Sequence, residues 1–336
     1  MSPNWNQPSS TYTEKEKDSV KTKKEQEQIS DMTRLENFIP ESPRRSLDDI
    51  VLTASVREQI QSALNQIQYR DKLYNEWNLK KIDPNGSRTV INFFGPPGTG
   101  KSFAAEAVSS YLNKKIIKIN YAEIESKYVG ETPKNITAAF TKAKESNSVL
   151  FFDEADSILG KRLTNVTQSA DHGVNVSRSV MLLQLDNFDG VVLFATNLPE
   201  NFDGAFVRRI LAHVEFVLPD LDCRIQLWNY LLPEEVPRNE CIKVAWLAEQ
   251  SEGLSGGDIL NVVKLSAGKA VSRPPVDCKL IQRDIIEAIS QVRNAKAKVS
   301  TQFVNRKETV KEETVDPSKL SPEEKEQYDQ VIASLQ

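Results

Sequence analysis

Residues 95–102 of this 336-residue chain read Gly95-Pro96-Pro97-Gly98-Thr99-Gly100-Lys101-Ser102, and they decide the fold. They fit the pattern G-x-x-x-x-G-K-[ST], which binds nucleotide phosphates. Glycines let the backbone curl so that successive N–H groups point inward and hold an anion. The amine of Lys101 can then reach the β- and γ-phosphates, and the hydroxyl of Ser102 can bind Mg²⁺. The alternative is a plain Gly/Pro turn. We predict instead that all eight residues bind a nucleoside triphosphate.

The segments around this loop predict an α/β fold. An apolar run precedes the loop, and the Ala-rich residues 102–112 after it read as a helix whose positive N-terminus faces the phosphates. Apolar, β-branched runs alternate with helical stretches along the chain, at residues 90–93, 116–119, 149–152, 191–195 and 213–217. Buried strands that alternate with helices indicate a doubly wound domain with a parallel, five-stranded sheet.

The composition changes along the chain, and this predicts four parts. Residues 1–45 are polar with few apolar groups, so we expect a disordered N-terminal arm. Residues 46–218 form the α/β domain, and 219–294 carry apolar residues at helical spacing, which predicts a small helical lid domain. Residues 295–336 read as a polar, charged C-terminal tail.

The bulk properties argue against several classes of protein. The formal charge of −4 gives no electrostatic reason to expect nucleic-acid binding. Three distant cysteines lack metal-ligand spacing and look like reduced thiols, and no run is as long as a membrane span. We therefore expect a soluble, cytoplasmic protein.

Two acidic residues follow the third apolar run, which ends at Asp153-Glu154. A carboxylate at the end of a buried strand needs a partner, because burying a charge is costly. Mg²⁺ supplies that partner for Asp153, and Ser102 is the second predicted metal ligand. Glu154 is then placed to deprotonate the attacking water as a general base. The pair makes the protein a hydrolase rather than a binder alone.

Asn197 follows the fourth apolar run, in the segment Ala195-Thr196-Asn197. An amide at that strand end can hydrogen-bond both the γ-phosphate and the attacking water. Taken alone, Asn197 is better read as a turn residue that ends a strand before Leu198-Pro199.

The combined spacing of these motifs resembles the AAA clade of the AAA+ family of ATPases, over roughly residues 46–294. Beyond the two nucleotide motifs, the resemblance rests on the sensor-1 segment 195–197, the second region of homology at 202–209, the sensor-2 segment 253–258, the pore-loop segment 127–131 and the adenine-contacting entry at 46–51. By resemblance, Ile50, Val51 and Gly257 contact the nucleotide. The Gly-Gly that usually follows the entry in this family is absent here.

The resemblance also implies roles in an assembly. Arg208, Arg209 or both would reach a neighbouring subunit's nucleotide, and we favour Arg208 as the arginine finger. Without the family, both read as surface cations. A stimulation of roughly 10³- to 10⁵-fold is typical of such an arginine. Lys127, Tyr128 and Val129 would form a pore loop that grips polypeptide, although Tyr128 also reads as a half-buried loop aromatic.

The expected function is that of a ring-shaped, ATP- and Mg²⁺-dependent ATPase, a hexamer of identical chains that remodels or unfolds a partner protein. An alternative is a nucleotide-switched scaffold or regulator with slow turnover. A DNA loader is disfavoured, because neither an electropositive channel nor a sensor-2 arginine is visible.

Overall fold

The computed structural model describes residues 33–83, 89–124, 131–160, 169–197 and 202–309. Contacts between residues divide it into two units. The first extends to residue 233 and includes residues 243–260, and the second consists of residues 234–242 and those from 261 onward.

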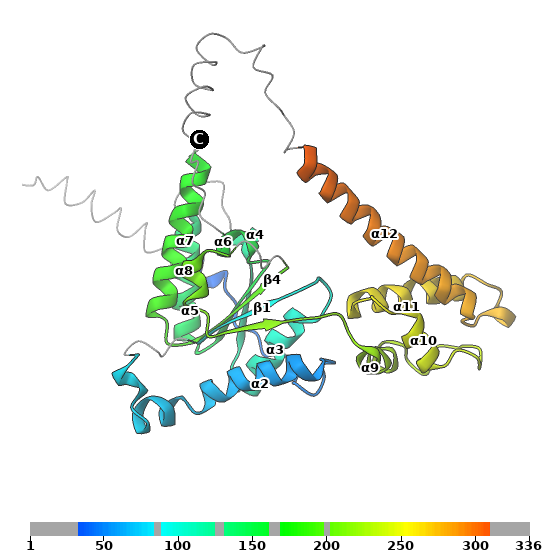
Figure 1. The fold of residues 1–336 in the computed structure, drawn as a ribbon, viewed down its shortest axis with the longest axis horizontal. Helices are drawn as coiled ribbons and strands as arrows, with labels where there is room; N and C mark the ends of the chain where they lie inside the picture. Colours follow the sequence, from blue (N-terminus) through cyan, green and yellow to red (C-terminus); the bar gives the residue numbers. More distant parts are fainter. Residues whose placement is uncertain (1–32, 84–88, 125–130, 161–168, 198–201, 310–336) are drawn as a thin grey trace, which may run out of the picture. The chain divides into compact units, whose positions relative to one another are not determined.

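A parallel sheet forms the centre of the first unit (Figure 1). Its strands are β1 (Thr89–Phe94), β2 (Ile116–Asn120), β3 (Val149–Asp153), β4 (Val191–Thr196) and β5 (Ala212–Glu215). All paired neighbours are parallel, in the order β2-β3-β4-β1-β5. This confirms the predicted five-stranded sheet. Strand β5 ends two residues before the apolar run does, because its partner β1 ends at Phe94, opposite Glu215.

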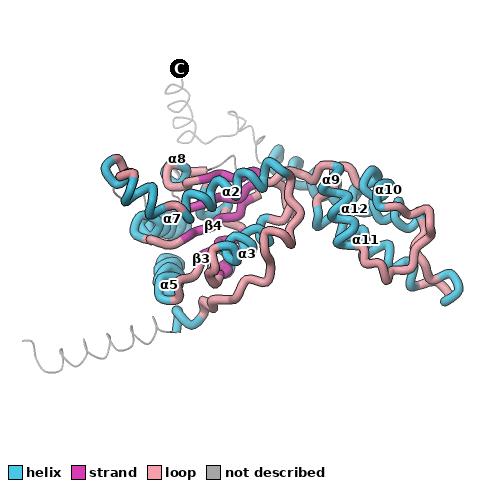
Figure 2. The backbone as a smooth tube through the Cα atoms, turned by 90° about the horizontal axis from the view of Figure 1, so that it is seen from below, coloured by secondary structure: helices cyan, strands magenta, loops and turns pink. Residues whose placement is uncertain are grey.

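Helices cover both faces of the sheet, as a doubly wound fold requires (Figures 1 and 2). On one face lie α2 (Ala54–Gln68) and α3 (Lys101–Tyr111), and on the other α5 (Glu131–Glu145) and α7 (Ser169–Asn187). Alternate strand residues face opposite ways: Val90 packs with the core under α5 and α7, and Ile91 with the core under α2 and α3.

Short elements complete the sheet region within the described residues. They are the π-helical segment Lys72–Glu76, the 3-10 turn Leu79–Lys81, and the helices α4 (Tyr121–Ile124), α6 (Asp156–Leu159) and α8 (Gly204–Val207). Helix α6 follows β3 within three residues, so it places polar groups at the carboxyl end of the sheet.

Residues 33–45 correct one expectation, because they belong to the fold and not to a disordered arm. Phe38 is buried in the core, and the backbone of Glu41 exchanges two 2.9 Å hydrogen bonds with Ile116 of the edge strand β2. Arg34 also pairs with Glu131 of α5 at 2.6 Å. Phe38 and Leu35 pack against the core, and together with the backbone pairing and the ion pair they hold this otherwise polar stretch. Composition alone does not reveal such contacts.

Helices follow β5, and no strand follows it within the described residues. In the first unit, α9 (Leu221–Leu231) and α10 (Val244–Gln250) are joined by a 2.9 Å bond from Trp228 Nε1 to Ser251 Oγ. Helix α11 (Gly256–Val271) begins in this unit and continues into the second. The lid boundary at residue 218/219 stays a prediction.

The second unit contains the rest of α11, the 3-10 turn Pro275–Asp277 and the long helix α12 (Gln282–Thr309). Lys269 of α11 pairs with Glu287 of α12 at 2.8 Å. Helix α12 continues past residue 295, where the sequence predicts only a charged tail. The predicted helix at 322–335 lies outside the described residues.

Candidate active site

The loop at residues 95–102 connects β1 to α3, as predicted, and its shape depends on glycine. Gly95 has φ +138°, and a Cβ there would lie 2.0 Å from the carbonyl oxygen of Phe216. Gly98 has φ +75°, and its Cβ would lie 2.6 Å from Ser255 Oγ. Positive φ is costly for other residues, so both positions favour glycine for conformation. Gly95 is also required for space, because the atom that its Cβ would meet belongs to the backbone.

Lys101 begins α3, and its amine is folded under the loop. Nζ donates to the carbonyl oxygens of Gly95 at 2.7 Å and Pro96 at 2.9 Å, and to Oδ1 of Asn197 at 2.8 Å. Burial lowers the pKa of Lys101 to about 8, against the opposing effect of the carboxylates of Asp153 and Asp156. Because burial disfavours the charged ammonium, a bound anion would stabilise it.

Ser102 and Asp153 meet across the end of the sheet. The Ser102 hydroxyl donates to Asp153 Oδ2 at 2.8 Å, although the two lie on α3 and β3. Hydroxyl and carboxylate oxygens are ligands that Mg²⁺ accepts, and this ion usually takes only one or two protein ligands beside water and substrate phosphates. No cluster of three or more His, Cys, Asp or Glu suited to a metal occurs in the described part of the chain. The pair therefore fits Mg²⁺ rather than an ion held by protein alone.

Glu154 has an unusual backbone for a non-glycine residue, with φ +52°. Its N–H donates to Asp153 Oδ1 at 3.0 Å, which satisfies the backbone group in this turn. Strained positions of this kind cost of order 1–3 kcal/mol and cluster at functional sites. The carboxylate is exposed and lines the same cavity as Ser102 and Asp153.

These groups surround one cavity of about 370 Å³, and every residue that lines it belongs to the first unit. The predicted Ile50, Val51, Gly257 and Asn197 are all among the lining residues. Gly257 is also tied to the phosphate loop, because its N–H donates to the Gly98 carbonyl at 3.0 Å. The cavity thus contains the phosphate loop, both acids, the sensor-1 amide and the expected entry segment.

The sequence analysis missed several groups that line this cavity. Arg45 lies with its guanidinium carbon 3.7 Å from the ring centroid of Phe103, and both residues line the cavity. Arg45 also pairs with the buried Glu106 of α3 at 3.6 Å. Val56, Leu227 and Tyr230 add apolar and aromatic surface from α2 and α9. Only the position of Phe103, directly after Ser102, offered a signal in the sequence.

Arg208 and Arg209 do not line the cavity of their own chain, and the two differ. Arg209 makes two bonds to Asp186 of α7, Nε to Oδ1 at 2.9 Å and Nη2 to Oδ2 at 2.7 Å, and Asp186 raises the pKa of Arg209. Nη1 also donates to the Ala205 carbonyl at 2.9 Å. Arg208 is exposed, and within the described residues the structure shows no partner for it.

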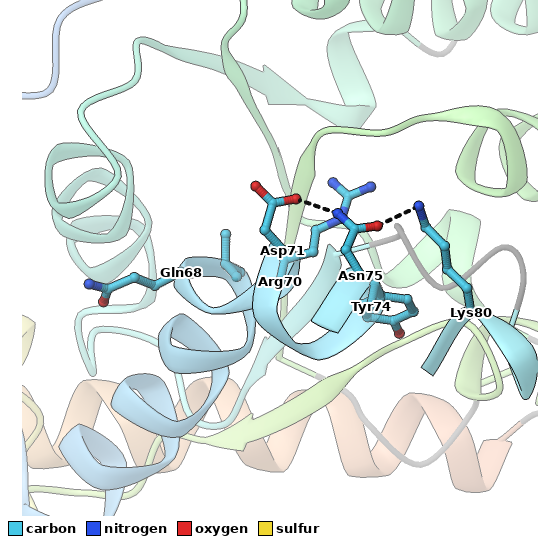
Figure 3. A pocket seen from close by; sticks show the side chains of 7 residues that line it. Gln68, Arg70, Asp71, Tyr74, Asn75 and Lys80 are labelled. Atoms are coloured by element: carbon cyan, nitrogen blue, oxygen red, sulfur yellow. Dashed lines mark hydrogen bonds between the residues drawn. The ribbon is translucent and has the colours of Figure 1, made fainter. Parts of the chain in front are cut away.

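The predicted pore-loop residues Lys127, Tyr128 and Val129 lie outside the described residues. A second hollow, of about 410 Å³, lies between the end of α2 and the 3-10 turn (Figure 3). There Asn75 donates to Asp71 at 3.1 Å and accepts from Lys80 at 2.7 Å. Arg70 and Gln68, which also line it, bond to Asp189 and Tyr111 outside the hollow. None of the lining residues belongs to a predicted motif, so we assign the hollow no role.

Comparison with known sequences agrees with this geometry. Residues 91–218, which run from β1 to just beyond β5, match the family model "ATPase family associated with various cellular activities (AAA)". This segment of the chain belongs to the AAA family of ATPases. An AAA domain implies nucleotide binding, and the cavity above is lined by residues of the predicted nucleotide motifs.

Relatives of the AAA domain occur among longer proteins. The chain is 36% identical to "Katanin p60 ATPase-containing subunit A1" of Strongylocentrotus purpuratus over 53% of its own length and 36% of the relative's. It is 30% identical to a cell division cycle protein 48 homologue of Archaeoglobus fulgidus, over 89% of its own length and 39% of the relative's. It is 29% identical to a proteasome-activating nucleotidase of Methanopyrus kandleri, over 79% of its own length and 60% of the relative's. The chain thus spans less than two thirds of each relative. Among its described helices, none has the length and apolar character needed to cross a bilayer.

Proposed function

We propose that the chain hydrolyses ATP in the cavity between the phosphate loop and the ends of β3 and β4. One observation carries this proposal: Lys101, Ser102, Asp153, Glu154 and Asn197 all line a single cavity. They come from three segments of the sequence, and each supplies a group that phosphoryl transfer requires.

The phosphate loop and Lys101 would bind the β- and γ-phosphates. Lys101 already donates three hydrogen bonds to oxygen acceptors, so it exchanges protein acceptors for phosphate oxygens rather than desolvating a free ammonium. Ser102 and Asp153 would hold Mg²⁺. When bound, this ion neutralises charge on the phosphate oxygens.

Glu154 would accept the proton of the attacking water. Its carboxylate is exposed to the cavity, and the bond from its N–H to Asp153 fixes the turn that carries it. Asn197 would orient the water and the γ-phosphate, since its amide lies within hydrogen-bond distance of Lys101. General-base assistance of this kind contributes typically about 10²- to 10⁴-fold to the rate.

Arg208 would act on the nucleotide of a neighbouring copy. It is exposed and has no partner within the described residues, whereas Arg209 is committed to Asp186. This difference supports the choice of Arg208 as the trans arginine. It requires that copies of the chain assemble, and we propose a ring, most simply a hexamer.

The ring would use ATP hydrolysis to remodel a partner protein. The family and the printed names of the relatives, a proteasome-activating nucleotidase among them, support this role. We propose that Tyr128 and its neighbours contact the polypeptide. A cytoplasmic location stays a prediction.

The substitution Glu154→Gln tests the proposed hydrolysis. The variant keeps the side-chain volume and removes the base, so we expect ATP to bind normally and turnover to fall at least about 100-fold. Glu145→Gln, at an exposed position near the end of α5, is the matched control and should behave as wild type. Undiminished turnover by Glu154→Gln would refute the role of the base.

Turnover in the presence of partner protein separates a motor from the alternative of a slow, nucleotide-switched scaffold. The Glu154→Gln variant in the presence of ATP serves to capture the partner protein. If that partner is a remodelling substrate, its addition should raise the ATPase rate of the wild-type chain. A scaffold's partner would bind but leave the rate unchanged.

A further inference from the structure

Asp156 lies at the start of α6, three residues beyond Asp153, and it does not line the nucleotide cavity. Its Oδ1 accepts a hydrogen bond from the hydroxyl of Thr196, and a second, at 3.2 Å, from the backbone N–H of Asn197. Both donors lie at the end of β4. One carboxylate oxygen therefore holds the point at which the sensor-1 residue leaves the sheet.

A backbone hydrogen bond also joins the turn after β3 to the end of β4: the N–H of Ala155 donates to the carbonyl of Ala195 at 3.0 Å. The side chain of Asn197 reaches the other way, to Nζ of Lys101 at 2.8 Å. The backbone of Asn197 is thus bound on one side by Asp156, while its amide faces the phosphate loop.

We propose that Asp156 is the positioning residue of the sensor-1 amide: through Thr196 and the Asn197 backbone it fixes where the Asn197 side chain meets the γ-phosphate. This inference rests on the proposed ATP hydrolysis. Asp156 itself is not among the residues that line the cavity.

Because Thr196 is buried, loss of its hydrogen bond to Asp156 would be costly. Thr196 is 1% exposed, so loss of its acceptor leaves a hydroxyl without that bond in a dry environment. Hydrogen bonds to a charged acceptor are about twice as strong as neutral ones, so the carboxylate holds both donors firmly. A shift of about 1 Å in a catalytic group costs on the order of 100-fold in rate. Displacement of Asn197 would therefore slow turnover without removing the phosphate loop that binds the nucleotide.

Asp156 has a second route to the site, since its negative charge also favours the charged form of Lys101. The two routes respond differently to substitution. Asn keeps an oxygen that accepts both hydrogen bonds but carries no charge, whereas Ala removes both the acceptor and the charge. Asp156→Asn should therefore retain turnover if position is what matters.

The test compares kcat for ATP, Kd for ADP and thermal stability in Asp156→Asn, Asp156→Ala and Thr196→Val. We expect kcat to fall about 10- to 100-fold in Asp156→Ala, as for other residues that orient catalytic groups. Thr196→Val should lose less, and Asp156→Asn should stay within about threefold of wild type. The Kd for ADP should not change, because ADP lacks the γ-phosphate that Asn197 contacts.

A double-mutant cycle with Asn197→Ala decides whether Asp156 acts through that residue. In the Asn197→Ala background, Asp156→Ala should cause no further loss of kcat, since additivity fails for groups that act as one. If Asp156→Ala does not fold, Thr196→Val carries the same cycle.

Three results would overturn the inference: wild-type turnover in Asp156→Ala, equal loss in Asp156→Asn and Asp156→Ala, or additive losses with Asn197→Ala. An equal loss would mean that Asp156 acts through the effect of its charge on Lys101. A wild-type chain that does not hydrolyse ATP would instead refute the proposed function itself, and this inference with it.

Discussion

Nζ of Lys101 and Oδ1 of Asn197 lie 2.8 Å apart, a hydrogen bond that joins the start of α3 to the end of β4. It connects the group expected to bind the phosphates with the group expected to orient the attacking water. Lys101 is only 8% exposed, whereas Asn197 is exposed, and the burial of the amine predicts a pH dependence of nucleotide binding.

Nucleotide affinity should fall as the pH rises through about 8. Burial lowers the pKa of Lys101 in the free protein to about 8, so the amine loses its charge there, whereas bound phosphates would restore a pKa above that value. Binding at pH 8.5 should therefore take up a proton. Calorimetry of ADP binding in two buffers of different ionisation enthalpy measures this uptake, and Lys101→Met should abolish it.

The same shift affects folding with a defined sign. The folded pKa of Lys101, about 8, lies below the ordinary 10.5, so the unfolded chain binds more protons between these values. The contribution of Lys101 to the free energy of unfolding should increase as the pH rises from about 8 to 10.5. Denaturant titrations at pH 7.5 and 9.5 should show this gain in the wild type relative to Lys101→Met. A larger gain in Lys101→Met would contradict the assigned shift.

Mixing two inactive variants should restore activity if Arg208 acts in trans. Arg208→Ala keeps its own Glu154, and Glu154→Gln keeps its own Arg208. In a mixed assembly, some sites combine the intact base of one copy with the intact arginine of the next. ATPase activity of the mixture should exceed the sum of the two separate variants. Activity that never exceeds this sum argues for a role within one chain.

Arg209 should matter for stability rather than for complementation. Its two bonds to Asp186 join α7 to the turn after α8, and the two side chains are 26% and 34% exposed. Because water partly screens the pair, we expect Arg209→Ala to lower the free energy of unfolding by about 1–2 kcal/mol. Urea denaturation measures this, with the exposed Arg208→Ala as the control that should leave stability nearly unchanged.

Gly95 should not tolerate alanine. The new Cβ would overlap the carbonyl oxygen of Phe216, and φ +138° is strained for any L side chain. We expect a loss of at least about 2 kcal/mol in the free energy of unfolding, together with weaker nucleotide binding. Gly204→Ala is the matched control, because no atom lies within 4 Å of its Cβ position and no positive φ is found there.

Arg45 should contribute to nucleotide affinity. It lines the cavity and stacks on Phe103, so Arg45→Ala should weaken ADP binding by up to about tenfold, or 1.4 kcal/mol. Arg44→Ala, at an exposed neighbouring position outside the cavity, is the control. Equal affinities of the two variants would limit Arg45 to packing on α3.

The sequence by itself determined the parts of this protein whose signal is local. Local signals identified the glycines and Lys101 of the phosphate loop, the acids at the end of β3 and the five apolar runs. They could be found because strand burial and loop curvature depend on the residues of short segments. Tertiary structure alone decided which distant groups meet. Phe38 and Glu41 tie a polar segment to the sheet, Arg45 enters the cavity, Asp186 takes up Arg209, and Asp156 holds Asn197. These contacts depend on the order of the strands in the sheet and on how the turns pack. Neither can be read from short stretches of sequence, because both depend on residues that are far apart in the chain.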